Sequence, residues 1–313
     1  MEKVDNFLWT EAYRPRRVAE TILPEDLKKT FQEFIKQKNI PNLLLTGRAG
    51  VGKTTVARAM LEELDVDYYI INASLNGNID TLRNDIRNFA SSVSFKGGRK
   101  YCILDEADYL TPMTQPALRN FMEEYSKNCG FILTCNFKNK IIQPLHSRCT
   151  VIDFRIENKD KGPISIQFAK RAFLILDNEK VSYDKAVVVE VVKKYFPDWR
   201  RVLNELQRYS ASGKIDSGIL SNLSEVSLEG LLKAMKEKNF TAVRKWVGEN
   251  LDLDTSVLFR QFYDYSANYF KAGSIPEVII TLAEYQYKEA FAVDVEISRA
   301  ACLAEIMVKV EWI

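Results

Sequence analysis

The chain has 313 residues, of which 46% are hydrophobic and 27% charged, and its formal net charge is +2. This length predicts two or three domains, and the composition allows a sizeable buried core. The net charge is too small to indicate nucleic-acid binding by itself, so any such binding must depend on local placement. No apolar run approaches the ~18 residues that a membrane helix needs, and the first residues do not form a signal peptide, so a cytoplasmic protein is expected.

Cysteine and histidine usage argues against a zinc site and against a disulfide framework. The five cysteines include no C-x-x-C pair, and there is one histidine, His146. This pattern favours free buried thiols in a reducing compartment. His146 is interpreted as a packed or surface residue rather than a ligand or a base.

Residues 7–24 form an aromatic and aliphatic segment that contains Tyr13, Arg14 and Pro15. Pro15 disfavours the α conformation of the residue before it, so this stretch is predicted to be extended. Its side chains either cover an adenine ring or simply pack on the core, and these residues alone favour packing. An amphipathic helix is predicted next, over 25–38.

The central motif follows at residues 43–55. A short apolar run predicts a buried strand, Gly47–Gly52 a loop, and Lys53 the start of a helix. This is G-x-x-x-x-G-K-T in the strand–loop–helix context of a phosphate-binding loop. Glycines let backbone N–H groups approach phosphate oxygens, Lys53 binds the β- and γ-phosphates of ATP, and the Thr54 hydroxyl is placed for Mg²⁺. The predicted nucleotide-binding residues here are Gly47, Gly50, Val51, Gly52, Lys53, Thr54 and Thr55.

A second motif, which is acidic, follows another apolar strand that is predicted over 101–104. Asp105 and Glu106 come at the end of that strand, where parallel sheets bind their ligands. Asp105 is predicted to hold Mg²⁺, directly or through water, and Glu106 to polarise the attacking water. A solvated acidic turn is the plainer alternative, and the phosphate loop upstream disfavours it.

Further strands are predicted over 68–72, 130–136 and 151–154, with helices between them. Asn136 ends one of these strands, where it either orients water near the γ-phosphate or forms an ordinary turn. The alternation of strands and helices predicts a doubly wound α/β domain with a parallel sheet.

The strand signal stops after Phe154, and helices are predicted over 164–176, 184–195 and from Asp198 onwards. Arg200 lies in the first turn of the last of these, where a cation opposes the helix dipole. It therefore either meets an external anion, such as a bound nucleotide, or is simply solvated. A Gly/Ser-rich linker is expected at 211–223. Apolar stripes at helical spacing predict that the remainder is helical, and its many aromatic residues favour a helix–helix core partly shared with other subunits.

Several of these stretches together resemble the AAA+ clamp-loader ATPases, most closely the large subunits of T-even-type bacteriophage loaders. The resemblance is good over 7–210 and weak in the final hundred residues, and Ser147-Arg148-Cys149 is its most family-specific part. The matching residues are 9–15, 47–54, 105–108, 134–136, 147–149 and 197–200.

The resemblance implies an AAA+ core at 1–156, a three-helix lid at 157–212 and an all-helical collar at 213–313. It implies a Mg²⁺-dependent ATPase, stimulated by DNA and clamp, that opens a sliding clamp and places it on primer–template DNA during replication. The expected assembly is a five-membered ring of this chain with a different small subunit.

The resemblance also implies roles for individual residues. Asn136 would be the sensor-1 residue, Arg148 the finger that reaches the neighbour's ATP, and Arg200 the sensor-2 residue of the lid. Tyr13, Arg14 and Pro15 would wrap the adenosine. All parts of the ATPase are present, so a motor subunit is expected.

DNA is expected to be held through its backbone by two helix N-termini and two arginines. A solvated face is an equal alternative for each arginine. Ala12 replaces the family's usual lysine and Asn120 the second of two arginines, which leaves individual DNA contacts open. The predicted DNA-binding residues are Asn78, Ile79, Arg83, Arg87 and Thr111.

Two other functions fit parts of this pattern. One is another AAA+ replication ATPase, such as a helicase loader or an initiator, although no helix-turn-helix module is recognisable after residue 223. The other is a ring scaffold that binds ATP without hydrolysing it. Glu106 together with Arg148 argues against the scaffold, because binding alone needs neither residue.

Overall fold

The computed structural model describes residues 7–74, 79–111, 113–211, 213–216, 218, 228–251, 253, 255–289 and 291–313. The chain divides into two compact units, Met1–Asn222 and Leu223–Ile313. Each unit is described by itself below. None of the described helices is both long and apolar enough to cross a membrane. The five cysteines are free, and four of them are buried.

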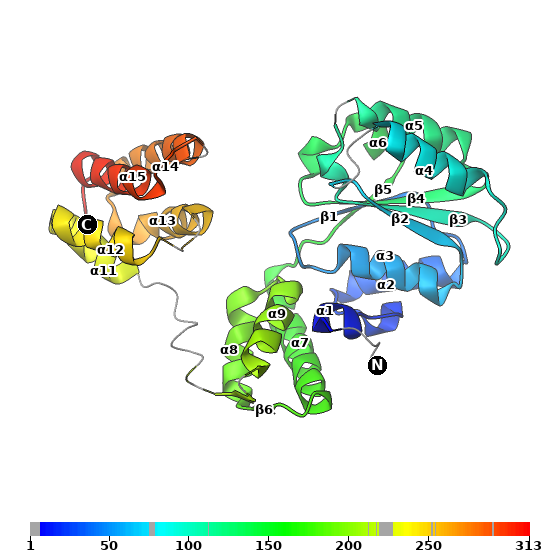
Figure 1. Cartoon of the computed structure of the whole chain (residues 1–313), viewed down its shortest axis with the longest axis horizontal. Helices are drawn as coiled ribbons and strands as arrows, with labels where there is room; N and C mark the ends of the chain where they lie inside the picture. Colours follow the sequence, from blue (N-terminus) through cyan, green and yellow to red (C-terminus); the bar gives the residue numbers. More distant parts are fainter. Residues whose placement is uncertain are drawn as a thin grey trace. The chain divides into compact units, whose positions relative to one another are not determined.

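The first unit is built on a five-stranded parallel sheet with the strand order β2-β3-β4-β1-β5 (Figure 1). The run of apolar residues in each central strand is explained by burial on both faces of the sheet. Since β1 pairs with β4 and β4 with β3, the carboxyl ends of these three strands lie along one edge. The strands are β1 (Leu43–Thr46), β2 (Tyr68–Asn72), β3 (Lys100–Asp105), β4 (Cys129–Cys135) and β5 (Thr150–Asp153).

Helices cover both faces of this sheet, which confirms the predicted α/β fold (Figure 1). One apolar cluster lies between the sheet and α2 and α3, and another between the sheet and α4, α5 and α6. Short helical turns connect the larger elements. The helices are α1 (Trp9–Ala12), η1 (Val18–Glu20), α2 (Glu25–Lys36), α3 (Lys53–Glu63), α4 (Ile79–Ser91), η2 (Ala107–Tyr109), α5 (Thr114–Glu124), η3 (Lys138–Lys140) and α6 (Gln143–His146).

After the sheet, the described part of this unit includes three longer helices: α7 (Asn158–Asn178), α8 (Lys185–Tyr195) and α9 (Trp199–Ser210). They form the predicted lid helices, and two short strands, β6 (Ser182–Tyr183) and β7 (Lys214–Ile215), pair in parallel beside them. β7 lies just beyond the expected end of the lid at residue 212, and its pairing groups it with the lid helices.

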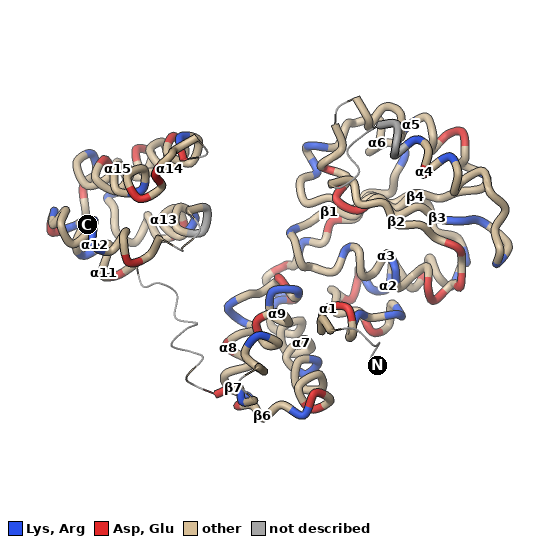
Figure 2. The backbone as a smooth tube through the Cα atoms, in the orientation of Figure 1, with Lys and Arg blue, Asp and Glu red and all other residues tan. Residues whose placement is uncertain are grey.

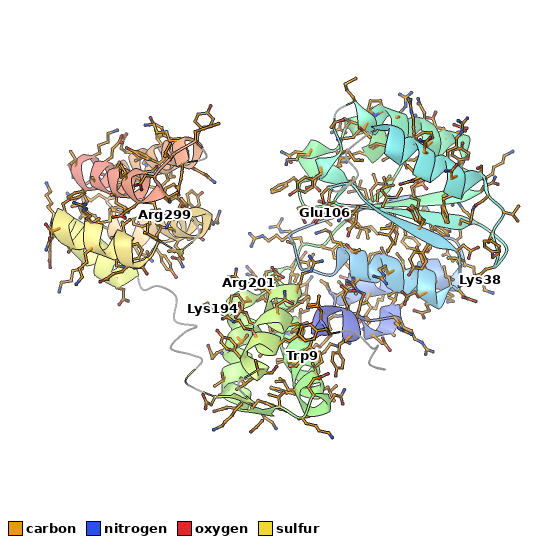
Figure 3. All side chains as sticks on the ribbon, viewed as in Figure 1. Trp9, Lys38, Glu106, Lys194, Arg201 and Arg299 are labelled. Atoms are coloured by element: carbon orange, nitrogen blue, oxygen red, sulfur yellow. The ribbon has the colours of Figure 1, made fainter. Side chains whose placement is uncertain are left out.

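The N-terminal segment is bound to the last lid helix. The Trp9 backbone N–H donates to Gln207 Oε1 at 3.0 Å, and Gln207 Nε2 donates to the Phe7 carbonyl oxygen at 2.6 Å. The Trp9 side chain is buried beside the lid helices (Figure 3). These hydrogen bonds hold the N-terminal segment, which includes α1, against α9.

The second unit is helical, as predicted, and its expected apolar stripes are buried. One cation, Arg299, is 5% exposed and points into the bundle (Figure 3). It donates to the Thr255 hydroxyl and to two backbone carbonyls, and it pairs with Glu289 at 3.4 Å, so its burial is compensated. The helices are α11 (Leu228–Lys236), α12 (Phe240–Glu249), α13 (Thr255–Tyr269), η4 (Ala272–Ser274), α14 (Ile275–Glu289) and α15 (Val295–Lys309).

Candidate active site

The loop between β1 and α3 has the backbone that its glycines permit. Gly50 and Gly52 adopt φ values of +74° and +97°, in the left-handed region that favours glycine. A Cβ atom on Gly50 would lie 1.9 Å from Asp198 Oδ1, so the loop approaches the lid too closely for a side chain. The Trp199 backbone N–H also donates to the Gly50 carbonyl at 3.2 Å. The phosphate loop and the first residues of α9 therefore lie in direct contact.

Lys53 begins α3 and is 7% exposed. Its ammonium donates to the carbonyls of Gly47 at 2.6 Å and Arg48 at 2.8 Å, and to Asn136 Oδ1 at 2.9 Å. These bonds occupy its three donors. Burial is the main cause that lowers the Lys53 pKa, and Asp105 and Asp108 act in the opposite direction. The charge is thus held in a desolvated site at the start of a helix, where anions bind.

The carboxylate at the end of β3 is bound by hydroxyls from two other elements. Thr54 Oγ1, on α3, and Thr134 Oγ1, on β4, both donate to Asp105 Oδ1, at 2.6 and 2.5 Å. The next residue, Glu106, has φ +56° and ψ +42°, and its backbone N–H donates to Thr134 Oγ1 at 3.1 Å. A hydroxyl beside a carboxylate is a donor set that suits Mg²⁺, which otherwise keeps waters and phosphate oxygens.

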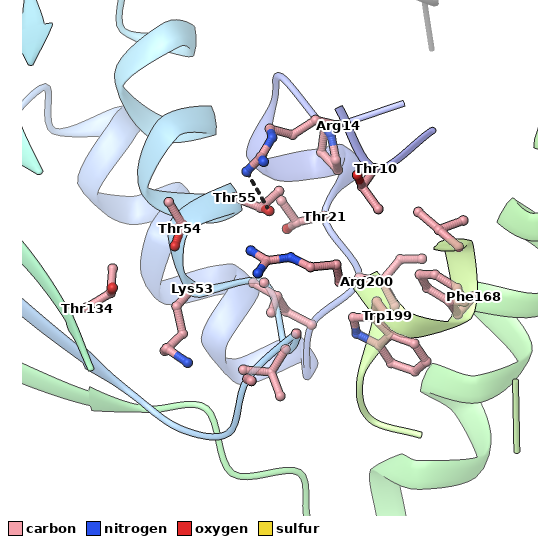
Figure 4. Close-up of a pocket in the computed structure, with 18 of the residues that line it drawn as sticks. Thr10, Arg14, Thr21, Lys53, Thr54, Thr55, Thr134, Phe168, Trp199 and Arg200 are labelled. Carbon is pink, nitrogen blue, oxygen red and sulfur yellow. Dashed lines mark hydrogen bonds between the residues drawn. The ribbon is translucent and has the colours of Figure 1, made fainter. Parts of the chain in front are cut away.

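The lid contributes a cation and an aromatic pair. Arg200 lies in the first turn of α9 and extends towards the start of α3 (Figure 4). Asp198 caps this helix by accepting from the Arg201 backbone N–H at 3.0 Å. Trp199 stacks on Phe168 with the ring centroids 4.2 Å apart. The structure therefore places Arg200 at the pocket, where an anion can offset its unfavourable position on the helix dipole.

The N-terminal segment closes another side of the same pocket. Tyr13, Arg14 and Pro15 all line it, and Arg14 Nη1 donates to Thr55 Oγ1 at 3.4 Å (Figure 4). The Tyr13 side chain is buried, and its hydroxyl donates to Glu179 at the end of α7. Burial, and then Glu179, raise the Tyr13 pKa. The segment thus both packs on the core and lines the pocket.

One pocket brings together most of the residues that the sequence singled out, with Ala49–Gly52 and the start of α3 on one side and the lid on another (Figure 4). Gly47 contributes its carbonyl to Lys53. Several other lining residues carry no motif in the sequence, and only folding brings them here. The predicted residues that line the pocket are Tyr13, Arg14, Pro15, Gly50, Val51, Gly52, Lys53, Thr54, Thr55, Asp105, Glu106, Asn136 and Arg200. The lining residues that were not predicted include Phe168, Arg171 and Leu203.

Arg148 lies apart from this group. Among the described residues it pairs with Glu123 on α5, with its Nε 2.8 Å from Glu123 Oε1, and its Nη1 donates to the Pro144 carbonyl at 2.9 Å. The described residues that line the pocket do not include it. This position agrees with the expectation that Arg148 lies away from the phosphate loop of its own chain.

Of the predicted DNA contacts, the described residues Arg83, Arg87 and Thr111 do not line the pocket. Arg83 and Arg87 are exposed on α4, and the exposed Thr111 hydrogen-bonds through its hydroxyl to Thr114 at 2.8 Å at the start of α5. Asn78 lies outside the described residues, and Ile79 is described only as the first residue of α4. Lys and Arg are interspersed with Asp and Glu along the described helices rather than gathered in one stretch (Figure 2).

Comparisons with known proteins, by family model and by sequence identity, indicate one family. Residues 43–157 match the family of ATPases associated with various cellular activities, and residues 160–221 match the AAA+ ATPase lid domain of the sliding-clamp-loader large subunit. The chain is 38% identical to the sliding-clamp-loader large subunit of Enterobacteria phage T4, over 75% of each chain. It is 31% identical to the replication factor C small subunit of Sulfurisphaera tokodaii, over 98% of this chain and 97% of that one.

Among solved structures, the Thermotoga maritima RuvB Holliday junction branch migration motor shares the fold. The TM-score is 0.54 at 17% identity, covering 75% of this chain and 85% of that one. The nucleotide-binding motifs, the lid beside them and the extent of identity to clamp-loader subunits all indicate the same family. The chain therefore belongs to the sliding-clamp-loader family of AAA+ ATPases.

Proposed function

We propose that this chain is a motor subunit that hydrolyses ATP in the pocket between phosphate loop and lid in order to load a sliding clamp onto primer–template DNA. The observation that carries the proposal is the convergence of Lys53, Glu106 and Arg200 from three separate elements on one pocket. That convergence occurs in a chain whose relatives are clamp-loader subunits.

Each residue has a role that its position supports. Lys53 binds the β- and γ-phosphate oxygens, exchanging a carbonyl or amide partner for a phosphate oxygen. Glu106 accepts the proton of the attacking water, and Asn136 orients that water. Arg200 contacts the phosphates from the first turn of α9, so the position of the lid depends on which phosphates are bound. Tyr13, Arg14 and Pro15 enclose the adenosine.

A bound Mg²⁺ would be held by Thr54 and Asp105 and would neutralise charge that develops on the phosphates. The hydroxyl and carboxylate already lie 2.6 Å apart. In the second unit, residues 228–313 join copies of this chain and a different subunit in a ring of five. Arg148 completes the site of a neighbouring subunit, which makes hydrolysis depend on assembly.

DNA binding follows the backbone rather than the base sequence. The start of α4, the start of α5 and the exposed Arg83 and Arg87 contact phosphates. Such binding weakens steeply with added salt and varies little with base sequence.

The experiment that tests the proposal measures ATP hydrolysis by the assembled complex with the sliding clamp, with primer–template DNA, with both and with neither. Joint stimulation above the sum of the two separate effects is expected. Hydrolysis that is indifferent to the clamp but responds to a helicase would instead support the alternative of a helicase loader. A chain that binds ATP without any turnover under all four conditions would support the scaffold.

A further inference from the structure

The acidic residue that follows Glu106 by two positions is buried. Asp108 lies in η2 and is 5% exposed. A carboxylate in such a position is costly unless hydrogen bonds replace its lost water. Asp108 Oδ2 accepts from two backbone N–H groups, those of Asn136 and Phe137, each at 3.2 Å. The carboxylate thus binds the turn that follows β4.

That turn carries Asn136 to the pocket. Strand pairing of β4 with β1 ends at Cys135, so the ladder does not fix the next residue. The Phe137 side chain is 57% exposed and adds little burial to hold the turn. Asn136 Oδ1 in turn accepts from the Lys53 ammonium at 2.9 Å. A continuous series of hydrogen bonds therefore leads from Asp108 through the turn to Lys53.

We propose that Asp108 is a positioning residue, which holds Asn136 where its amide shares Lys53 with the γ-phosphate. The inference depends on the proposed ATPase site but assigns a separate residue within it. Asp108 does not touch the nucleotide. It acts through two backbone N–H groups, and its effect is expected on the contact of Lys53 with the γ-phosphate, which ATP makes and ADP lacks.

Substitution by asparagine preserves the size of the side chain and weakens its hydrogen bonds to the turn. Among the described residues Asp108 Oδ1 has no hydrogen-bond partner. In Asp108→Asn, the side-chain amide can take two orientations. With its NH₂ group at the position of Oδ1, that group would be buried without an acceptor. With its NH₂ group at the position of Oδ2, it would face the N–H donors of Asn136 and Phe137. Either orientation weakens the hold on Asn136.

The test measures the dissociation constants of ATP and ADP for the full-length chain, by titration calorimetry, and takes their ratio. Asp108→Asn should reduce the preference for ATP about tenfold, the equivalent of one charge-assisted hydrogen bond. Asn136→Ala should reduce it equally, and the double variant should show no further loss, because both changes interrupt one series of bonds. Asp26→Asn, which removes an exposed carboxylate on α2, should leave the ratio unchanged.

A merely structural role gives different results. Equal weakening of ATP and ADP by Asp108→Asn would overturn the inference, as would a second tenfold loss when Asp108→Asn is added to Asn136→Ala. A wild-type chain without preference for ATP over ADP would also overturn it. If Lys53→Ala binds ATP as well as wild type does, the proposed site itself is wrong, and that result is visible before Asp108 is altered.

Discussion

Lys53 and Glu106 reach the pocket from the ends of different elements, and the proposed mechanism assigns them to different stages of the reaction. Lys53 is a desolvated cation with its donors directed to oxygen acceptors, so its loss affects the binding of phosphate. Glu106 begins the turn after β3 in a left-handed conformation, which turns the chain just beyond Asp105. It is therefore suited to act on water rather than to hold the nucleotide.

Lys53→Ala should weaken ATP binding by about 10–100-fold, the equivalent of one hydrogen bond to a charged group. Glu106→Gln keeps the shape of the side chain and loses the base, so ATP should bind normally while turnover falls by about 10²–10⁴-fold. Calorimetry and phosphate release measure the two quantities separately. Equal loss of ATP affinity in both variants would contradict these roles.

Gly50 and Gly52 offer a matched pair that separates steric contact from backbone strain. Both have left-handed φ values, but a Cβ on Gly50 would lie 2.9 Å from the Asp198 Cα, whereas nothing lies within 4 Å of one on Gly52. Gly50→Ala should therefore destabilise the chain by about 1–3 kcal/mol more than Gly52→Ala does, as overpacking does. Thermal unfolding without nucleotide measures the difference. Equal melting temperatures would show that the loop does not contact the lid in solution.

At the scale of elements, the sequence predicts what is local and misses what depends on packing. The five strands and the phosphate loop were predicted because apolar runs and glycines signal them directly. β6 and β7 were missed, since two-residue strands have no periodicity to detect. α7 was expected from residue 164 but begins at Asn158, because Pro163 is accommodated near its start. Phe168 and Arg171 could not be assigned to the pocket, since the folding of the lid brings them there.

Two lid helices have aspartate N-caps, and only one of the caps touches the phosphate loop. Asp184 accepts from the Ala186 backbone N–H at 2.8 Å on α8, and Asp198 caps α9 beside Gly50. Each change to alanine should cost about 1 kcal/mol of stability, the usual value of an N-cap. Only Asp198→Ala should also weaken ATP binding, because it loosens the turn that presents Arg200. Equal ATP affinities of the two variants would contradict this coupling between lid and loop.

At the scale of the whole molecule, the chain combines a nucleotide-binding unit with a separate helical unit. The sequence predicted helices after the linker from apolar stripes, and the described part of the unit Leu223–Ile313 confirms them. The order of the strands could not be read from the sequence, because pairing between distant segments leaves no local pattern. Arg148 was expected from the family resemblance to act on a neighbour, and its distance from its own pocket is compatible with that role.

The central claim is that the site is completed by Arg148 of an adjacent subunit, and a mixing experiment tests it most directly. Complexes made only with Lys53→Ala lack a working site, and those made only with Arg148→Ala lack the finger. Such a finger contributes on the order of 10³–10⁵ in rate, so both uniform complexes should be nearly inactive when stimulated by clamp and DNA.

Complexes assembled from the two variants together should recover hydrolysis. An Arg148→Ala subunit keeps Lys53 in its own site, and Arg148 of a Lys53→Ala neighbour can complete that site. Steady-state phosphate release, measured against the fraction of each variant, should therefore pass through a maximum in the mixtures. Full activity of the uniform Arg148→Ala complex, or mixtures that are no more active than the two uniform complexes, would contradict the account.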